Sequence, residues 1–243
     1  RFRTALQYHY LDSAADYHRA VIGDERLTDK KYAAWWDLLD ELREKGLFNS
    51  DAADLSLAEG QDLFFKGGAG IFFDSYSNIS AAVREMGEDV VDIMIAPVPG
   101  SGALKGGLPV SSVSLGIPAQ APNPQEAGQF LELLLSGERQ NALYVATGVF
   151  PATDNVKNSV LAKRKIDKKV YEMIGDRAAM TSTRNHPSEF EEIIYGITEE
   201  FFTRGLNAGQ AAQMYEEAAQ RWREGYPQGV ENFRVWAEKP LPF

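Results

Sequence analysis

The sequence contains no cysteine and only three histidines among its 243 residues. The absence of cysteine excludes disulfide bonds, thiolate catalysis and zinc sites with cysteine ligands. His9, His18 and His186 stand far apart, and no two have the spacing at which a helix presents two histidines to one metal ion. We therefore expect neither a bound metal nor a cofactor, and we expect His9 and His18 to be ordinary surface or half-buried side chains and not ligands.

The chain also lacks a surplus of basic residues and a long hydrophobic run. Its net charge of −10 argues against a nucleic-acid partner, because phosphate binding requires a positive field. No run of about 18 apolar residues occurs, so the sequence predicts no membrane span. No signal peptide is visible and residue 1 is Arg rather than Met, so we expect a processed or cut chain, from which an export signal can have been removed.

Hydrophobic residues make up 44% of the chain, enough for one large domain or two small ones. Helical spacing and capping signals predict helices over residues 4–20, 28–45, 56–66, 77–85, 123–137, 138–146, 188–204 and 207–222. Trp35 and Trp36 lie on the apolar stripe of the second of these helices. A tryptophan at helical spacing usually lies in the core, and stacking on a sugar ring is the alternative.

Three short apolar runs predict β-strands between these helices. They are Ala69–Phe73, Val90–Val98 and Pro109–Ile117. Residues 99–107 are rich in glycine and predict a flexible connection between the last two strands. Strands that alternate with helices indicate an α/β fold.

A polar cluster directly follows the first predicted strand. It contains Asp74, Tyr76, Ser77 and Asn78, and a helical pattern begins at once after it. Open α/β sheets bind ligands at the carboxyl ends of their strands, so this turn is a candidate ligand site. The alternative is a simple strand-to-helix turn, in which Asp74 or Ser77 caps the helix.

A basic run lies further along the chain. It contains Lys163, Arg164, Lys165, Lys168 and Lys169. In an acidic protein such a run is typical of a solvated helix face, and we expect these side chains to point into water.

The order of segments resembles family 1 of the extracellular solute-binding proteins of ABC transporters, the sugar-binding type exemplified by maltose-binding protein. Five segments between Tyr32 and Gln220 are similar to motifs of that family. They are Ala33–Phe48, Ala58–Ala69, Ile93–Pro99, Pro124–Leu131 with Gly148–Ala152, and Pro187–Gln210. The resemblance to a Gly-Ser-Trp turn after the first strand is imperfect, because this chain reads Ser75-Tyr76-Ser77 there.

The resemblance implies an α/β, periplasmic-binding-protein-like fold of type II with two lobes. Residues 1–96 and 167–243 would form lobe two, and residues 97–166 would form the crossover and the returning piece of lobe one. Members of the family are longer, so we expect most of lobe one to be absent.

The resemblance also implies a function without catalysis. The protein would bind a carbohydrate or similar polar solute between its lobes and deliver it to the membrane permease of an ABC importer. It would act as a monomer in the periplasm or outside the cell, where a lipid anchor is an option.

The ligand contacts that the resemblance implies come from two segments. The residues are Asp74, Tyr76, Ser77 and Asn78 in the turn, and Arg184, His186, Ser188 and Glu191 near the start of a facing helix. Tyr76 would replace the stacking tryptophan, with its ring toward the crevice and its hydroxyl free of a buried protein partner. For the residues of the facing helix, a surface polar group or a helix cap is the alternative.

Two other functions stay open at this point. A glycoside hydrolase would need two carboxylates about 5 to 10 Å apart across one cleft, and Asp74 with Glu191 is the pair that the sequence offers. A sensor or structural module that kept the fold and lost the ligand is favoured by the tyrosine in place of tryptophan.

Overall fold

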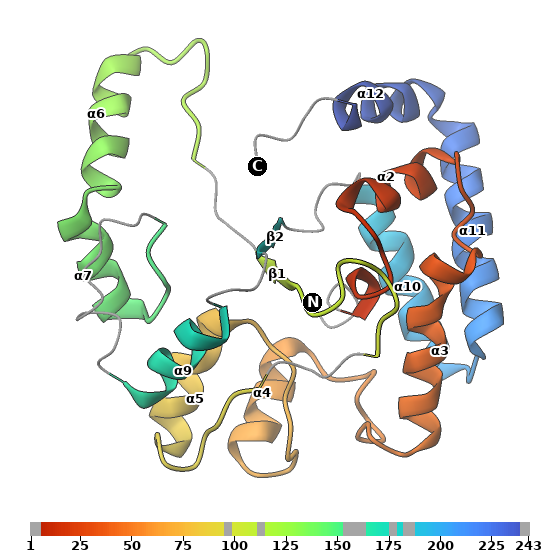
Figure 1. Cartoon of the computed structure of the whole chain (residues 1–243), viewed down its shortest axis with the longest axis horizontal. Helices are drawn as coiled ribbons and strands as arrows, with labels where there is room; N and C mark the ends of the chain where they lie inside the picture. The colour runs from red at the N-terminus through yellow and green to blue at the C-terminus, as the bar shows by residue number, and fades with distance from the viewer. Residues whose placement is uncertain are drawn as a thin grey trace. The chain divides into compact units, whose positions relative to one another are not determined.

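The computed structural model describes residues 6–94, 99–110, 115–152, 164–174, 179–181 and 188–238 (Figure 1). The chain divides into two compact units. Unit 1 comprises Arg1–Phe72, Pro97–Pro109 and Ala178–Phe243, and unit 2 comprises Phe73–Ala96 and Val110–Arg177. Each unit is therefore assembled from segments that are distant in the sequence.

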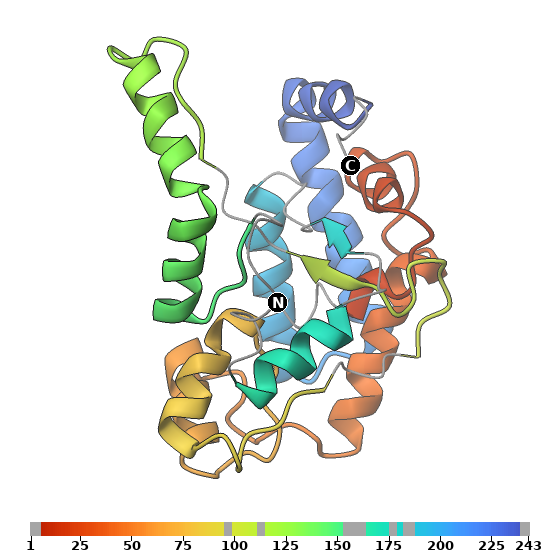
Figure 2. The same cartoon turned by 60° about the vertical axis from the view of Figure 1, so that its left-hand side comes forward.

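Unit 1 is built mainly from helices. They are α2 (Ala14–Ile22), α3 (Lys30–Glu44), α4 (Leu57–Phe65), α10 (Ser188–Thr203), α11 (Ala208–Gly225) and α12 (Pro227–Ala237). Helix α11 packs against α3 and α10, and α12 packs against α2, as Figures 1 and 2 show from two sides. The N-terminal and C-terminal parts of the chain thus share one core.

Helix α3 contributes the largest side chains of that core. Tyr32, Trp35 and Trp36 are almost completely buried. The Trp36 ring lies 5.5 Å from the ring of Phe201 on α10. The core interpretation of the tryptophan pair is confirmed.

Arg43, near the end of α3, links this helix to the end of α10 and to the segment before α11. Its guanidinium donates hydrogen bonds to the carbonyl oxygens of Phe201 (2.5 Å) and Leu206 (2.8 Å), which lie at the end of α10 and before α11. Asp40 accepts a hydrogen bond from Arg43 (2.5 Å) and another from the backbone N–H of Ala208 (3.0 Å). These bonds satisfy backbone groups that helix ends leave without an intrahelical partner.

The helix predicted over residues 4–20 is interrupted. Residues 6–8 are helical, but α2 begins only at Ala14. Asp16 accepts hydrogen bonds from the backbone N–H groups of Asp12 (2.7 Å) and Ser13 (3.0 Å). Ser13 with Asp16 forms a capping box, which starts a new helix where periodicity alone predicts a continuous one.

The glycine-rich connection of residues 99–107 is held in place where it passes residues 9–12. Backbone N–H groups of Gly102 and Leu104 donate to the carbonyl oxygens of His9 (3.1 Å) and Leu11 (3.0 Å). A Cβ atom on Gly102 would lie 2.1 Å from the Leu11 oxygen. The prediction of a flexible connection is wrong here, because glycine permits this close approach of two backbones.

The strand predicted over Ala69–Phe73 does not form. These residues are irregular, Ile71 is 81% exposed, and Phe72 and Phe73 are only half-buried. The Phe72 ring stacks on Phe64 of α4 with 5.9 Å between centroids. Burial against a helix thus replaces strand pairing, since a short apolar run is compatible with either.

The other predicted strands are shorter than expected or lie partly outside the described residues. Residues 90–94 are irregular, and residues 95–98 are outside the description. The third run contributes β1 (Leu108–Val110), which pairs with β2 (Ala179–Thr181), whereas residues 111–114 are outside and 115–117 are irregular. Among the described residues this two-stranded sheet is the only one, so the larger α/β sheet stays a prediction.

Unit 2 is also helical where it is described. Its elements are the 3₁₀ turn η1 (Tyr76–Asn78), α5 (Ile79–Met86), α6 (Pro124–Leu134), α7 (Gly137–Thr147) and α9 (Lys165–Ile174). Asn123 and Pro124 start α6 as predicted, but the helix ends at Leu134. Gly137 opens α7 instead of closing α6, because the Ser136 hydroxyl caps α7 by accepting from the Arg139 N–H (3.4 Å).

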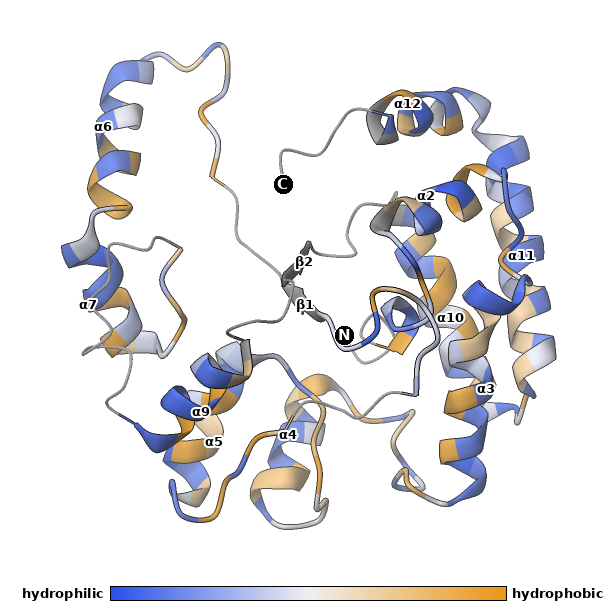
Figure 3. Ribbon diagram, in the orientation of Figure 1, coloured by the Kyte–Doolittle hydropathy of each residue, from blue (hydrophilic) through white to orange (hydrophobic). Residues whose placement is uncertain are grey.

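The core of unit 2 joins α5 to α9. Ile79 of α5 packs with Ile166 and Val170 of α9, and all three are buried. The partly buried residues around them are Tyr76, Val83, Val91, Ile93 and Phe150. Figure 3 shows hydrophobic and hydrophilic residues alternating along both helices, as amphipathic packing requires.

A first prediction tests the core of unit 1. Trp36→Ala should lower the free energy of unfolding by about 3 to 5 kcal/mol, because a fully buried ring is lost and leaves a cavity. Urea denaturation followed by far-UV circular dichroism measures this loss. The control is Tyr226→Ala, at a side chain that is 63% exposed, which should change stability by no more than about 0.5 kcal/mol. A loss below about 1 kcal/mol for Trp36→Ala would contradict the packing.

A second prediction concerns acid stability. Burial lowers the pKa of His9, with Lys105 adding to the effect, and burial alone lowers the pKa of His18. A histidine with a depressed pKa stabilises the fold above its unfolded pKa of about 6.5, and this stability is lost as the pH falls toward the folded value. The protein should therefore lose stability between pH 7 and pH 5.

The matched variant is His9→Asn. The His9 Nδ1 atom accepts a hydrogen bond from the Gly106 N–H (3.2 Å), and the asparagine carbonyl can accept the same bond without titrating. Urea midpoints at pH 7 and pH 5 should differ less in the variant than in the original protein. An equal difference would show that His9 contributes nothing to the pH dependence.

Candidate functional site

The predicted ligand turn is a compact hydrogen-bonded structure in unit 2. The Asp74 carboxylate accepts from the Ser75 N–H (2.7 Å) and from the Asn78 side-chain amide (2.8 Å). The hydroxyl groups of Ser75 and Ser77 lie 2.5 Å apart. These side chains organise the turn that opens α5, as expected for short polar residues at a helix start.

Tyr76 points into unit 2. Its ring stacks on Phe150 with 4.2 Å between centroids and an interplanar angle of 11°. Its hydroxyl lies 3.5 Å from Oδ1 of Asp167, which is only 1% exposed. The expectation that this hydroxyl would be free of a buried protein partner is wrong, because α9 places a carboxylate beside it.

The Asp167 carboxylate is the centre of a polar cluster. Arg164 donates from Nε and Nη2 to its two oxygens at 2.7 Å each. The Tyr144 hydroxyl donates to Oδ2 at 2.5 Å. A buried carboxylate is costly unless it is paired and hydrogen-bonded, and these donors supply both conditions.

The same environment affects the two tyrosines. Burial raises the pKa of the Tyr76 hydroxyl, and the nearby Asp167 charge raises it further. Burial and the hydrogen bond to Asp167 likewise raise the pKa of the Tyr144 hydroxyl. Both phenols are therefore neutral donors at physiological pH.

Gly148 allows Ser80 and Arg164 to approach the end of α7 closely. It ends α7 at a φ of 73°, in the left-handed region that favours glycine. A Cβ atom there would lie 1.9 Å from the Ser80 hydroxyl oxygen and 2.8 Å from Nη2 of Arg164. The Arg164 guanidinium also donates to this Ser80 oxygen (3.1 Å). A larger residue at position 148 would displace these partners.

The sequence interpretation missed most of this cluster. Phe150 appeared only as part of a family motif, and Tyr144 was not singled out. Arg164 was predicted to be solvated, yet its side chain is 26% exposed and bound to Asp167. Lys165, by contrast, is solvated as predicted, with 87% of its side chain exposed. An acidic residue three positions after Arg164, on the same helix face, was the signal that could have revealed the pair.

The second predicted segment is only partly described. Arg184 and His186 lie outside the described residues. Glu191 on α10 is half-buried and accepts a hydrogen bond from the Tyr195 hydroxyl (2.9 Å). Because α10 belongs to unit 1 and the turn to unit 2, their approach to one ligand stays a prediction.

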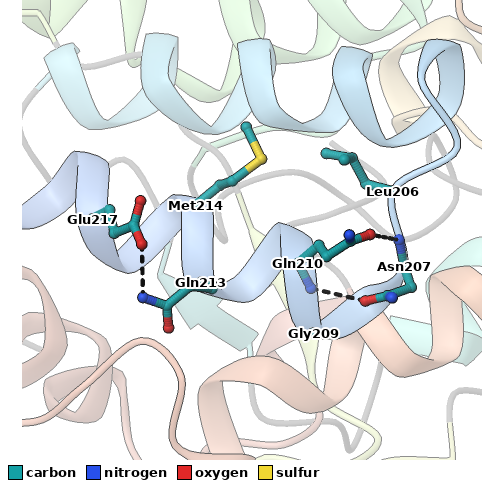
Figure 4. A pocket seen from close by; sticks show the side chains of 7 residues that line it. All are labelled: Leu206, Asn207, Gly209, Gln210, Gln213, Met214 and Glu217. Carbon is teal, nitrogen blue, oxygen red and sulfur yellow. Dashed lines mark hydrogen bonds between the residues drawn. The ribbon is translucent and has the colours of Figure 1, made fainter.

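Two surface cavities lie in unit 1. The first, of about 540 Å³, is lined by Leu206, Asn207, Gly209, Gln210, Gln213, Met214 and Glu217 of α11 and the residues before it (Figure 4). The second, of about 470 Å³, is lined by Arg43, Phe48, Asn49, Ser50, Ala52, Ala53, Asp54, Phe202 and Thr203. Neither cavity includes a residue of the predicted ligand turn.

The polar side chains that line the first cavity form hydrogen bonds within α11 and at its N-terminus. Asn207 and Gln210 bond each other's backbone N–H groups as a capping box, and Gln213 donates to Glu217 (2.9 Å) one turn later. Figure 4 shows both arrangements along α11. These bonds account for the polar side chains that line the cavity, so no ligand is needed to explain their presence.

Within the described ranges, no group of three or more His, Cys, Asp or Glu side chains is placed to hold a metal ion. In the same part of the chain, no helix is both long and apolar enough to cross a membrane.

Comparison with known proteins identifies the family. Residues 3–169, more than half of the chain, match the family described as bacterial extracellular solute-binding protein. The chain belongs to this family. The resemblance inferred from the order of segments is thereby confirmed. No curated protein matches the sequence of this solute-binding protein.

A solved structure supports the fold of this solute-binding protein. A chitin oligosaccharide binding protein is similar to it with a TM-score of 0.70 and 17% sequence identity. The similarity covers 92% of this chain and 56% of the other. The solute-binding protein chain thus spans a little over half the length of that structure, and the likeness shows the fold alone.

A third prediction tests the Tyr76–Tyr144 environment. A phenol with a raised pKa stabilises the fold below its unfolded pKa of about 10, and this stability is lost as the pH rises toward the folded value. Absorbance at alkaline pH should therefore show Tyr76 and Tyr144 ionising late, together with unfolding. Tyr144→Phe should remove one late phenol and flatten the decline in stability above pH 10. Ionisation of all tyrosines in one step near pH 10 would argue against the cluster.

Proposed function

We propose that the chain is part of the substrate-binding component of an ABC importer. It binds a carbohydrate or similar polar solute between two lobes, without catalysis, and delivers it to a membrane permease. The protein works as a monomer in the periplasm or outside the cell, with or without a lipid anchor. In this proposal residues 1–96 and 167–243 form lobe two and residues 97–166 return to lobe one.

The observation that carries the proposal is the combination of rings and polar groups at the turn. Tyr76 and Phe150 form a stacked aromatic pair, and Asp74, Ser77 and Asn78 stand next to it. A sugar presents apolar ring faces and hydroxyl edges, so its recognition needs both kinds of group. Family membership and the oligosaccharide named for the solved relative point in the same direction.

The remaining ligand contacts in the proposal come from Arg184, His186 and Glu191. Their residue types can donate to and accept from sugar hydroxyls. Tyr76 takes the place that a tryptophan holds in the family turn, and a smaller ring favours a small oligosaccharide or a single sugar over a long stacked chain.

Hydrolysis is disfavoured by the state of Asp74. Its carboxylate accepts hydrogen bonds within the turn, from the Ser75 N–H and the Asn78 amide, and the turn holds no second carboxylate. A hydrolase would need this group and Glu191 directed at one glycosidic bond. Turnover of an oligosaccharide in the binding assay would overturn the proposal in favour of catalysis.

Thermal-shift measurements over a panel of solutes test the proposal. The panel contains chitin oligosaccharides, malto-oligosaccharides, polyols, amino acids and polyamines. A ligand at about 100 times its dissociation constant adds about 2.7 kcal/mol of stability, which a melting curve resolves. Stabilisation by sugars alone is the expected result. Stabilisation by amino acids or polyamines alone, or by nothing, would contradict it, and the latter favours a sensor or structural module.

A fourth prediction identifies the ligand ring. Tyr76→Ala should weaken binding of the sugar found in the panel by about 2 to 3 kcal/mol, near a hundredfold, through lost stacking and lost ring burial. Titration calorimetry measures the affinity. The variant should also lose stability, because the ring packs on Phe150. Tyr226→Ala, at an exposed position in unit 1, is the control and should bind normally. Unchanged affinity of Tyr76→Ala would show that the turn only opens a helix.

A further inference from the structure

We propose that Asp167 is a positioning residue for the ligand ring and holds Tyr76 in the orientation in which it stacks on a sugar. The inference rests on the proposed function of the turn. Asp167 lies 91 positions after Tyr76 and does not belong to the turn. It acts through the tyrosine and not by touching the ligand.

Two contacts at opposite parts of the Tyr76 side chain define its orientation. The Phe150 ring lies nearly parallel to one face, which fixes the plane of the tyrosine ring. The Asp167 oxygen faces the hydroxyl at the far end, which fixes the direction of the ring within that plane. A flat ring held at its face and at its tip has little freedom left to rotate.

Asp167 can serve as a fixed point because it is itself held firmly. The two bonds from Arg164 and the one from Tyr144 are shorter than the contact with Tyr76, at 2.7, 2.7 and 2.5 Å against 3.5 Å. Helix α9, which carries Asp167, is packed on α5 through Ile166. Since α5 directly follows the turn, the carboxylate and the ligand ring share one rigid frame.

The contact with Tyr76 is also the longest of the set. The Arg164 and Tyr144 bonds hold the carboxylate in place, so the Tyr76 hydroxyl meets an acceptor whose position is already set. Preorganisation of this kind raises affinity by reducing the motion that binding must arrest.

The test compares two buried carboxylates. Asp167→Asn keeps the shape but removes the charge and one acceptor oxygen. The control is Glu216→Gln in unit 1, where a carboxylate that is 7% exposed bonds to Arg223 (2.7 Å) and to the Leu27 N–H (2.5 Å). Both variants should lose stability, but only Asp167→Asn should disturb Tyr76.

The first readout needs no ligand. The protein is labelled with 3-fluorotyrosine, and the ¹⁹F resonance of position 76 is assigned from its absence in Tyr76→Phe. In Asp167→Asn this resonance should shift or broaden, and in Glu216→Gln it should stay unchanged. An unchanged resonance in Asp167→Asn would overturn the proposal, whether or not any sugar binds.

The second readout is the affinity for a chitin disaccharide or the best sugar of the panel. Asp167→Asn should weaken binding on the order of tenfold. In the Tyr76→Ala background the same substitution should have less than about a twofold effect, because a residue that acts through Tyr76 has nothing left to position. A tenfold loss in both backgrounds would mean direct ligand contact or a general structural effect, and would overturn the assignment.

A milder variant covers the case in which Asp167→Asn does not fold. Tyr144→Phe removes one donor to Asp167 and keeps the ring, so it should produce a smaller change in the Tyr76 resonance and a smaller loss of affinity. No change in either would count against the proposal. If no sugar binds the unaltered protein, the proposed function fails by itself, and the ¹⁹F result still decides whether Asp167 fixes Tyr76.

Discussion

Burial of the Asp167 carboxylate constrains the whole of unit 2. A carboxylate that is 1% exposed requires donors close by, and the donors come from α7, from the residue directly before α9 and from the turn before α5. Each element must therefore end or begin at the right place. Gly148 ends α7 where Ser80 and Arg164 approach, and Phe150 follows where it can lie on Tyr76. The aromatic stack and the polar cluster therefore depend on the same helix ends.

Two helix starts were predicted well because a local capping pattern marks them. Ser56 with Glu59 and Asn207 with Gln210 form reciprocal bonds over three residues, so the sequence carries the complete instruction. The apolar stripes of α3 and α10 were predicted for the same reason, because periodicity of one helix shows which face is buried. The break before α2 was missed although Ser13 and Asp16 carry a similar signal, since apolar periodicity appeared to run through it.

Features that depend on distant partners were not predicted from the sequence. Phe72 packs on α4 and not in a strand, a choice that its own apolar neighbourhood does not determine. The turn residues Asp74 and Asn78 were placed together correctly, because they are close in the sequence. The inward direction of Tyr76 was not, because it depends on Asp167, which stands among lysines that suggest an exposed helix face. A single acidic residue inside a basic run is therefore a candidate for a buried ion pair with one of its basic neighbours.

The distribution of tryptophan has a consequence for spectroscopy. All four tryptophans of the chain, Trp35, Trp36, Trp222 and Trp236, belong to unit 1, whereas the ring cluster around Asp167 is made of tyrosine and phenylalanine. Excitation beyond the tyrosine absorption band therefore gives an emission signal from one unit alone. Tyrosine absorbance differences also include a contribution from the ring cluster of unit 2. Tryptophan emission can thus follow unit 1 by itself during unfolding or titration, without any introduced label.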